Sequence, residues 1–176
     1  MAEAYIALGS NLDPETHLCE AANLFSFLFT VTGVSDFYRN PAAGRPDQPG
    51  FVNGMVRVET DFPPLAVKQE ILQNLEEQLG RVRVEDKSAS RTIDLDLCLY
   101  GDMLLKEPGL ILPDPELTKR PFLFIPILDI DPGILFPGTD QKLSDLVPAR
   151  SRVKGMRRDA KLTSTIKEIL HGKSHP

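Results

Sequence analysis

Two aspartates that alternate with apolar residues are the side chains of this sequence best suited to chemistry. They lie in the run TIDLDLCLY at 92–100, whose alternation predicts a strand with Ile93, Leu95, Leu97 and Leu99 on one face. Asp94 and Asp96 then share the other face with Cys98 and Tyr100, about 7 Å apart along the strand. Aspartate is depleted in strands, and two like charges repel. A divalent cation such as Mg²⁺, which prefers carboxylate and phosphate oxygens, would offset this repulsion.

Cationic side chains surround this aspartate pair in the sequence. Four precede it, and two more follow later: Arg81, Arg83, Lys87, Arg91, Lys119 and Arg120. Arginine grips phosphate with a planar fork and lysine binds it as a point charge. Carboxylates beside cations therefore predict a metal–polyphosphate site suited to phosphoryl or pyrophosphoryl transfer. The alternative is a solvated strand face, with the aspartates paired to nearby arginines and the cations neutralising Glu85 and Asp86.

A second segment suggests a pocket for a flat ligand. Residues 40–53, NPAAGRPDQPGFVN, form a loop rich in proline and glycine that leads into a strand. Phe51 and Asn53 lie on the same face of that strand, one offering a stacking surface and the other both donor and acceptor atoms. Phe122 could supply a second wall. The alternative for either phenylalanine is ordinary packing in the core.

The elements that would carry these residues follow from periodicity and from glycine and proline. We expect, in order, a strand at 3–8 bounded by Gly9, a helix at 14–29 with Asp13 as N-cap, a strand over Val34 to Arg39, a strand over Phe51 to Glu59, a helix from Asp61 to Gly80, and a strand at 92–100. A hairpin or turn near 101–113 and a short helix from Phe122 to Ile130 follow.

The order β-α-β-β-α-β predicts an α+β fold of the ferredoxin-like, split βαβ kind. Its core would be a four-stranded antiparallel sheet with both helices on one face and the other face free to carry a site, plus an extra C-terminal hairpin and helices. A Rossmann-type parallel sheet is the rival. The turn Gly-Ser-Asn at 9–11 lacks the G-x-G-x-x-G pattern that such a sheet would need.

Charge and composition exclude several classes of protein. Residues 1–139 hold 11 Lys/Arg and 21 Asp/Glu, which argues against a nucleic-acid-binding body. No apolar run reaches the roughly 18 residues of a membrane span, and the N-terminus does not have the pattern of a signal peptide. Two cysteines, Cys19 and Cys98, are too few for a disulfide scaffold or a zinc site, so we expect a reduced, cytoplasmic compartment.

The C-terminal part of the chain differs from the rest in charge. Residues 140–176 hold 9 Lys/Arg and 4 Asp/Glu. We therefore divide the chain into a catalytic domain, residues 1–139, and a basic extension, residues 140–176. In the extension, Leu162, Ile166, Ile169 and Leu170 predict a short amphipathic helix. The extension is either a solvated appendage or a contact for an acidic partner.

Six segments of the chain are similar to one known family. They are AYIALGSNL at 4–12, SDFYRNP at 35–41, DQPGFVNG at 47–54, LEEQLGRVR at 75–83, RTIDLDLCLYG at 91–101 and LPDPELTKRPF at 112–122. The most specific run is K-x-A-S-R-T-I-D-L-D-L at 87–97. On these residues the chain resembles the 6-hydroxymethyl-7,8-dihydropterin pyrophosphokinases of folate biosynthesis, and the resemblance extends over most of residues 4–137.

The resemblance implies a transfer of pyrophosphate from ATP to the hydroxymethyl oxygen of the pterin, with AMP leaving. It implies two Mg²⁺ ions on Asp94 and Asp96, phosphate contacts from Arg81, Arg91 and Arg120 with Arg83 nearby, and Glu76 on the nucleotide side. Asn53 would bind the pterin edge, Phe51 and Phe122 would enclose its ring, and Pro41, Ala42, Ala43 and Gly44 would line the pocket. The implied partners are these small molecules, not nucleic acid or a membrane.

Three positions depart from the family pattern. Asp114 stands where the family usually has histidine, Asn40 where it commonly has threonine, and Ser88 where it often has an aromatic residue. These departures leave a non-catalytic pterin-binding protein as the alternative function. An unrelated Mg²⁺-dependent hydrolase or nucleotidyl transferase is a third reading of the aspartate pair.

Overall fold

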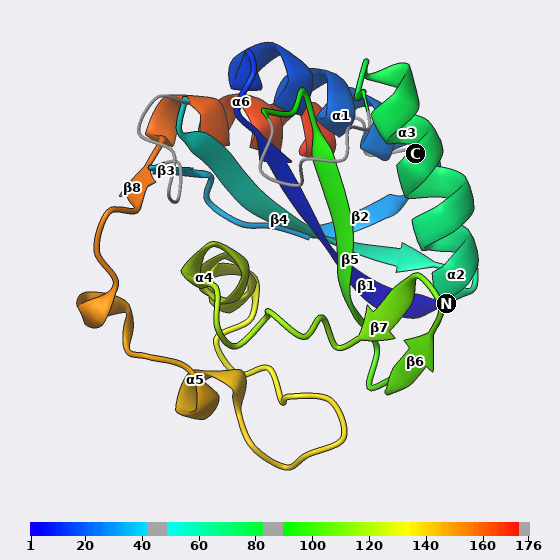
Figure 1. Cartoon of the computed structure of the whole chain (residues 1–176), viewed down its shortest axis with the longest axis vertical. Helices are drawn as coiled ribbons and strands as arrows, with labels where there is room; N and C mark the ends of the chain where they lie inside the picture. Colours follow the sequence, from blue (N-terminus) through cyan, green and yellow to red (C-terminus); the bar gives the residue numbers. More distant parts are fainter. Residues whose placement is uncertain (42–48, 83–89, 173–176) are drawn as a thin grey trace.

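The chain forms an α+β fold around an antiparallel sheet (Figure 1). The computed structural model describes residues 1–41, 49–82 and 90–172. The sheet consists of β1 (Ala2–Ser10), β2 (Thr30–Val34), β3 (Tyr38–Asn40), β4 (Phe51–Thr60), β5 (Asp94–Tyr100) and β8 (Arg157–Arg158). Its order is β5-β1-β4-β3-β8, and β2 also pairs with β4. A separate hairpin joins β6 (Leu105–Glu107) to β7 (Leu110–Leu112), as the sequence predicts for residues 101–113.

One face of the sheet is covered by helices from three parts of the chain. They are α1 (Pro14–Leu28), the continuous segment of α2 (Pro64–Ala66), η1 (Val67–Leu72) and α3 (Gln73–Gln78), and α6 (Ala160–His171). Their apolar side chains, among them Leu18, Leu72 and Ile166, share one hydrophobic cluster with Ile6 and Leu95 of the sheet. Burial of this cluster supplies the main driving force for the layered arrangement. The helix that follows Asp61 is π-helical in its middle part, from Val67 to Leu72.

The opposite face is only partly free, contrary to the prediction. Helix α4 (Pro121–Ile130) and the single turn α5 (Leu143–Leu146) pack there, and a short 3-10 turn, η2 (Arg150–Arg152), follows them. Phe124 and Ile127 of α4 join Tyr5, Met55 and Leu99 in a second cluster. Figure 1 shows α4 and α5 on the side of the sheet away from α1 and α6. This cover leaves Phe51, Asn53 and Asp94 half-exposed at the other end of the strands.

The alternation along β5 breaks after Leu97, which corrects the predicted faces of Leu99 and Tyr100. Tyr5 pairs with Leu99 but Ile6 pairs with Leu97, so Cys98 is the extra residue of a β-bulge. Tyr100 therefore packs in the cluster under α1, whereas Leu99 packs in the cluster under α4. Because the bulge lies beyond the aspartates, Asp94 and Asp96 still share a face.

The strand predicted over Val34 to Arg39 is wrong, since two strands take its place. β2 ends at Val34 and β3 begins at Tyr38, with Ser35 between them. The buried Ser35 hydroxyl accepts the backbone N–H of Met55 at 2.8 Å, in the position where a strand carbonyl would stand. Side-chain bonding of this kind competes with a regular ladder. At the start of α1, Asp13 occupies the N-cap position as expected, but its side chain makes no capping hydrogen bond.

The C-terminal segment is part of the layered structure and not a solvated appendage. The predicted amphipathic helix is α6, which packs against α1 and buries Leu162, Ile166 and Leu170. Strand β8 adds to the sheet through β3. The division of the chain at residue 139 stays a prediction. Among the described residues, no helix combines the length and the apolar character that a membrane crossing requires.

Candidate active site

The register of the sheet places a glycine between the two predicted half-sites. Gly9 of β1 pairs with Asn53 of β4 on one side and with Asp94 of β5 on the other. Neighbouring strands lie about 4.8 Å apart, so Asn53 and Asp94 are about 10 Å apart across the central strand. The next rung on the same face joins Met55, Ala7 and Asp96. The aspartates and Asn53 therefore share one face of the sheet.

The side-chain amide of Asn53 lies over Gly9, in the space that a side chain at this position would need. A Cβ atom built on Gly9 would lie 2.6 Å from Nδ2 of Asn53 and 3.9 Å from Cβ of Asp94. The sequence predicts that Gly9 bounds the first strand, but Gly9 lies inside β1. A glycine within a buried strand often marks a close approach by a ligand or a backbone, and that signal could have identified it.

Both carboxylate oxygens of Asp94 bind arginine. Arg81 donates to Oδ1 and Arg91 to Oδ2, each at 2.6 Å. Arg81 also pairs with Glu76 of α3, a carboxylate that is only 2% exposed and that accepts the Leu95 N–H at 2.7 Å. Burial raises the pKa of Glu76, and the nearby Asp94 raises it further. The alternative of an aspartate paired with arginine thus describes Asp94, and the same contacts bring two arginines, Arg81 and Arg91, to one carboxylate.

Asp96 has a different partner, which the sequence analysis missed. Lys68 of η1 donates to Asp96 Oδ1 at 2.6 Å and to the Leu95 carbonyl at 3.0 Å. A lysine beside the apolar stripe of Val67, Ile71 and Leu72 is typical of a solvated helix face, so periodicity gave no reason to single it out.

Asp114, which replaces the family histidine, lies near Asp96. Its backbone N–H donates to the Cys98 carbonyl at 2.9 Å, and its Oδ1 accepts the Glu116 N–H at 2.7 Å. Burial raises the pKa of Asp114, and the charge of Asp96 adds to this shift, whereas Lys68 opposes it. The departure from the family pattern is therefore a partly buried acid whose charge Lys68 partly offsets.

The residues predicted for the flat ligand are only partly brought together. Oδ1 of Asn53 accepts the side-chain amide of Asn40 at 3.0 Å, and Phe51 pairs with Asn40 across β3 and β4. Phe122 is half-buried at the start of α4, against the second cluster. No ring contact joins Phe51 to Phe122 in the parts of the chain that the structure describes. Ala42, Ala43, Gly44 and Arg83 lie outside the described residues, as do Lys87 and Ser88.

Arg120 is not joined to the aspartate pair by any hydrogen bond or ion pair within residues 1–41, 49–82 and 90–172. It is half-exposed at the N-cap of α4, and its Nε donates to Glu116 at 2.9 Å. A phosphate contact by Arg120 stays a prediction.

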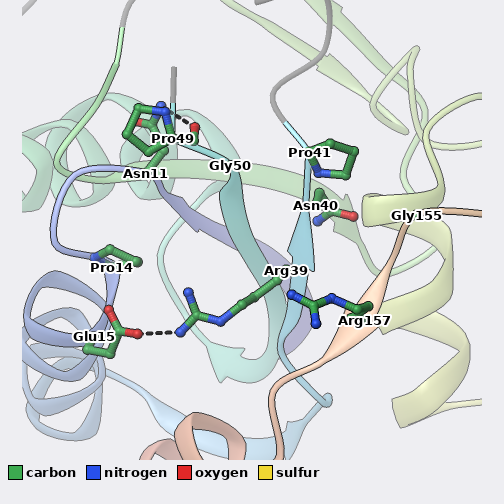
Figure 2. A pocket seen from close by; sticks show the side chains of 10 residues that line it. All are labelled: Asn11, Pro14, Glu15, Arg39, Asn40, Pro41, Pro49, Gly50, Gly155 and Arg157. Carbon is green, nitrogen blue, oxygen red and sulfur yellow. Dashed lines mark hydrogen bonds and ion pairs between the residues drawn. The ribbon is translucent and has the colours of Figure 1, made fainter. Parts of the chain in front are cut away.

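A cavity of about 490 Å³ lies beside Pro41, at the end of the sheet near the start of α1 (Figure 2). Asn40, Arg39 and Arg157 also line it, and Figure 2 shows Arg39 reaching Glu15 across it. Phe51, Asn53 and Phe122 are absent from its described lining. The cavity therefore is not the predicted pocket enclosed by the two phenylalanines.

The chemistry of the donors on the site face fits a divalent cation. Two carboxylates alternate on β5, and no hydrogen bond or ion pair to Oδ2 of Asp96 is found within the described ranges. Carboxylate oxygens have further lone pairs, so the arginine contacts of Asp94 do not exhaust its capacity. No group of three or more His, Cys, Asp or Glu side chains suited to a metal occurs in the part of the chain that is described. Two carboxylates completed by ligand oxygens are the usual protein share of a magnesium site.

Comparison with known proteins identifies close sequence similarity. The family model described as 7,8-dihydro-6-hydroxymethylpterin-pyrophosphokinase (HPPK) matches residues 5–132. The 2-amino-4-hydroxy-6-hydroxymethyldihydropteridine pyrophosphokinase of Haemophilus influenzae is 36% identical over 150 residues, which cover 84% of this chain and 92% of that protein. The protein of the same name from Bacillus subtilis is 38% identical over 130 residues, covering 72% and 77% respectively.

The folic acid synthesis protein fol1 of Pneumocystis carinii is 36% identical over 137 residues, which cover 77% of this chain and 18% of that larger protein. Among solved structures, the Plasmodium falciparum HPPK-DHPS protein with SDX-DHP matches with a TM-score of 0.63 at 12% identity. The alignment covers 90% of this chain and 47% of the Plasmodium chain, so this chain spans about half of that protein. At that identity the structural match supports the fold alone.

Proposed function

Because this chain belongs to the 7,8-dihydro-6-hydroxymethylpterin-pyrophosphokinase family, we infer that it transfers pyrophosphate to the hydroxymethyl group of 6-hydroxymethyl-7,8-dihydropterin in folate biosynthesis. The observation that carries the inference is the rung formed by Asn53, Gly9 and Asp94. It brings a group able to bind a heterocycle and a group able to bind a metal to one face of the sheet, on either side of a residue without a side chain.

ATP is the proposed donor and AMP the leaving group. Mg²⁺, when bound, would neutralise charge on the transferred pyrophosphoryl group. Asp94 and Asp96 would hold two such ions. Arg81 and Arg91 would then either turn from Asp94 toward the phosphate oxygens or contact Asp94 and the phosphate oxygens at the same time. Such an enzyme works mainly by positioning its substrates and stabilising developing charge. The ion pairs of Arg81 with Glu76 and Asp94 favour this assignment, because they fix the position of the Arg81 guanidinium before a nucleotide binds.

The pterin half of the proposal rests on Asn53. Its amide offers a donor and an acceptor, and Asn40 orients it by donating to Oδ1. The donor Nδ2 is then directed to the space above Gly9. Phe51 and Phe122 are proposed to enclose the ring, and Pro41 to Gly44 to complete the pocket.

Four further expectations extend the proposal. The strand order β5-β1-β4-β2, with α1 and α2–α3 on one face, supports the ferredoxin-like split βαβ assignment for the core. A domain at 1–139 with a C-terminal extension is proposed on charge. A cytoplasmic location is proposed because Cys19 and Cys98 are both free thiols. ATP and the reduced pterin are the proposed small-molecule partners.

An AMP-release assay tests this function. We expect AMP to form only when ATP, Mg²⁺ and the reduced pterin are all present, and Asp96→Ala to abolish its formation. Phosphate or pyrophosphate released without pterin would instead indicate a hydrolase or nucleotidyl transferase. Calorimetry that detects pterin binding but no ATP binding at millimolar Mg²⁺ would indicate a non-catalytic pterin-binding protein.

A further inference from the structure

The residue between the two aspartates is held from outside the sheet by two side chains. Leu95 lies in β5, at the edge of the sheet, and both its backbone N–H and its carbonyl bind side chains of the helical segment that packs there. Glu76 accepts the N–H and Lys68 donates to the carbonyl. A strand at the edge of a sheet has no neighbour to bind its outward N–H and carbonyl groups, and these two side chains bind them instead. They do so at Leu95, the residue between Asp94 and Asp96.

Lys68 reaches this position from the far face of the sheet. Its neighbours Val67 and Leu72 are fully buried in the cluster under α1, on the face opposite to the aspartates. The side chain passes the edge of β5 and ends on Asp96 Oδ1, and only 17% of it is exposed. The helix is π-helical from Val67 to Leu72, and π-helical turns are frequent at functional sites.

The two aspartates differ in how much of each carboxylate is engaged. Asp94 uses both oxygens for arginine, whereas Asp96 uses Oδ1 for Lys68 and its side chain is 45% exposed. Asp96 Oδ2 therefore offers the open oxygen of the pair, counted over the described residues. A divalent ion that binds it would share one carboxylate with an ammonium group.

Within the described residues, the charge around this pair is nearly balanced. Four carboxyl groups, Glu76, Asp94, Asp96 and Asp114, interact with three cations, Lys68, Arg81 and Arg91. An added lysine charge repels a bare divalent cation but attracts a nucleotide triphosphate that carries one divalent ion, because the net charge of that complex is negative. The two ligands therefore respond in opposite directions to the loss of that charge.

We propose that Lys68 is a positioning residue of this site, a resident counter-ion that fixes Asp96 through Oδ1 and makes the site select a metal–nucleotide complex over a free divalent cation. The proposal rests on the proposed function. Lys68 would be a further residue on the nucleotide side of the site. Its charge would favour binding of the metal and the nucleotide as one complex.

Binding measurements on full-length Lys68→Met test the proposal. Paramagnetic resonance would give the affinity of nucleotide-free protein for Mn²⁺, and calorimetry its affinity for a non-hydrolysable ATP analogue in excess Mg²⁺. We expect Mn²⁺ to bind about tenfold more tightly than in the wild type and the analogue to bind about fivefold more weakly, from the loss of one charge near the ligand. Lys68→Arg keeps the charge and should change neither affinity by more than about twofold.

The matched control is Lys167→Met, which removes another lysine–aspartate pair, with Asp36, on α6. It should leave both affinities unchanged. A merely structural role of Lys68 predicts that Lys68→Met weakens both ligands or neither, and any result without tighter Mn²⁺ binding overturns the proposal. The variant Asp96→Asn distinguishes a wrong role for Lys68 from a wrong metal site. If Mn²⁺ binds this variant as tightly as it binds the wild type, Asp96 is not a metal ligand and the proposed function fails at that point.

Discussion

Replacing Gly9 by alanine should damage pterin binding selectively. The added Cβ would lie 2.6 Å from Nδ2 of Asn53, where ordinary contact begins at 3.4 Å. The Asn53 amide must therefore move by about 0.8 Å or rotate. Either change weakens the 3.0 Å hydrogen bond from Asn40 and redirects the Nδ2 donor away from the ligand space.

The expected loss follows from one misplaced hydrogen-bonding group. Leaving a buried polar group without its partner costs about 1–3 kcal/mol. This corresponds to a pterin dissociation constant raised between about 5-fold and 150-fold. The nucleotide side should be spared, because the Cβ meets Asp94 at an ordinary 3.9 Å. Stability should stay within about 1 kcal/mol of the wild type, since replacing glycine in extended backbone restricts the unfolded chain and offsets the crowding.

The assay is calorimetric titration of the pterin at a saturating concentration of a non-hydrolysable ATP analogue, together with urea unfolding. Gly54→Ala is the contrasting variant. Its Cβ would lie 2.6 Å from ring atoms of the fully buried Phe37, so it should lower the free energy of unfolding by about 1–3 kcal/mol. Wild-type pterin affinity in a folded Gly9→Ala protein would refute the assignment of Asn53 to the pterin pocket.

Three further predictions concern stability. Burial raises the pKa of Asp114, so the folded state holds this proton more tightly than the unfolded chain. Wild-type stability should therefore fall as pH rises from 3.8 through the raised pKa, and Asp114→Asn should remove that part of the profile of urea midpoints. Arg150→Met loses the 2.6 Å ion pair with Asp129 and its contact with Tyr38, which should cost about 1 kcal/mol in urea unfolding. Ile166→Ala should cost about 3 kcal/mol, because the side chain is fully buried.

Each of these has a result that would contradict it. Parallel pH profiles for Asp114→Asn and the wild type would mean that this carboxyl has the same pKa in both states. Arg150→Met is compared with Lys119→Met, whose exposed pair with Glu116 should leave the urea midpoint unchanged. If the Ile166→Ala protein were as stable as a protein with the exposed Thr165→Ala change, the packing of α6 on the core would not contribute to stability.

Local patterns in the sequence were enough to place most of the elements. The alternation of 92–100 predicts correctly that Asp94 and Asp96 share a face and that Leu95 and Leu97 are buried opposite them. Periodicity also gives the bounds of α1 nearly to the residue and the existence of α6. These predictions succeed because burial of one face depends on neighbours in the sequence.

The errors occur where a residue's environment comes from distant segments. The bulge at Cys98 results from pairing with β1, and the Ser35 hydroxyl interrupts a strand because it binds Met55. The cover of α4 over the second face depends on packing that no local pattern encodes. Lys68 contacts Asp96 only because its helix packs against the edge of β5.

The sequence by itself determined the chemical groups, their order along the chain and the family to which they belong. The tertiary structure decided their partners: Asn53 and Asp94 face each other across Gly9, and a lysine from the opposite layer ends on Asp96. The physical reason is that a side chain's periodicity is set by its own backbone. Strand register and helix docking, in contrast, are set by the summed burial and pairing of the whole sheet.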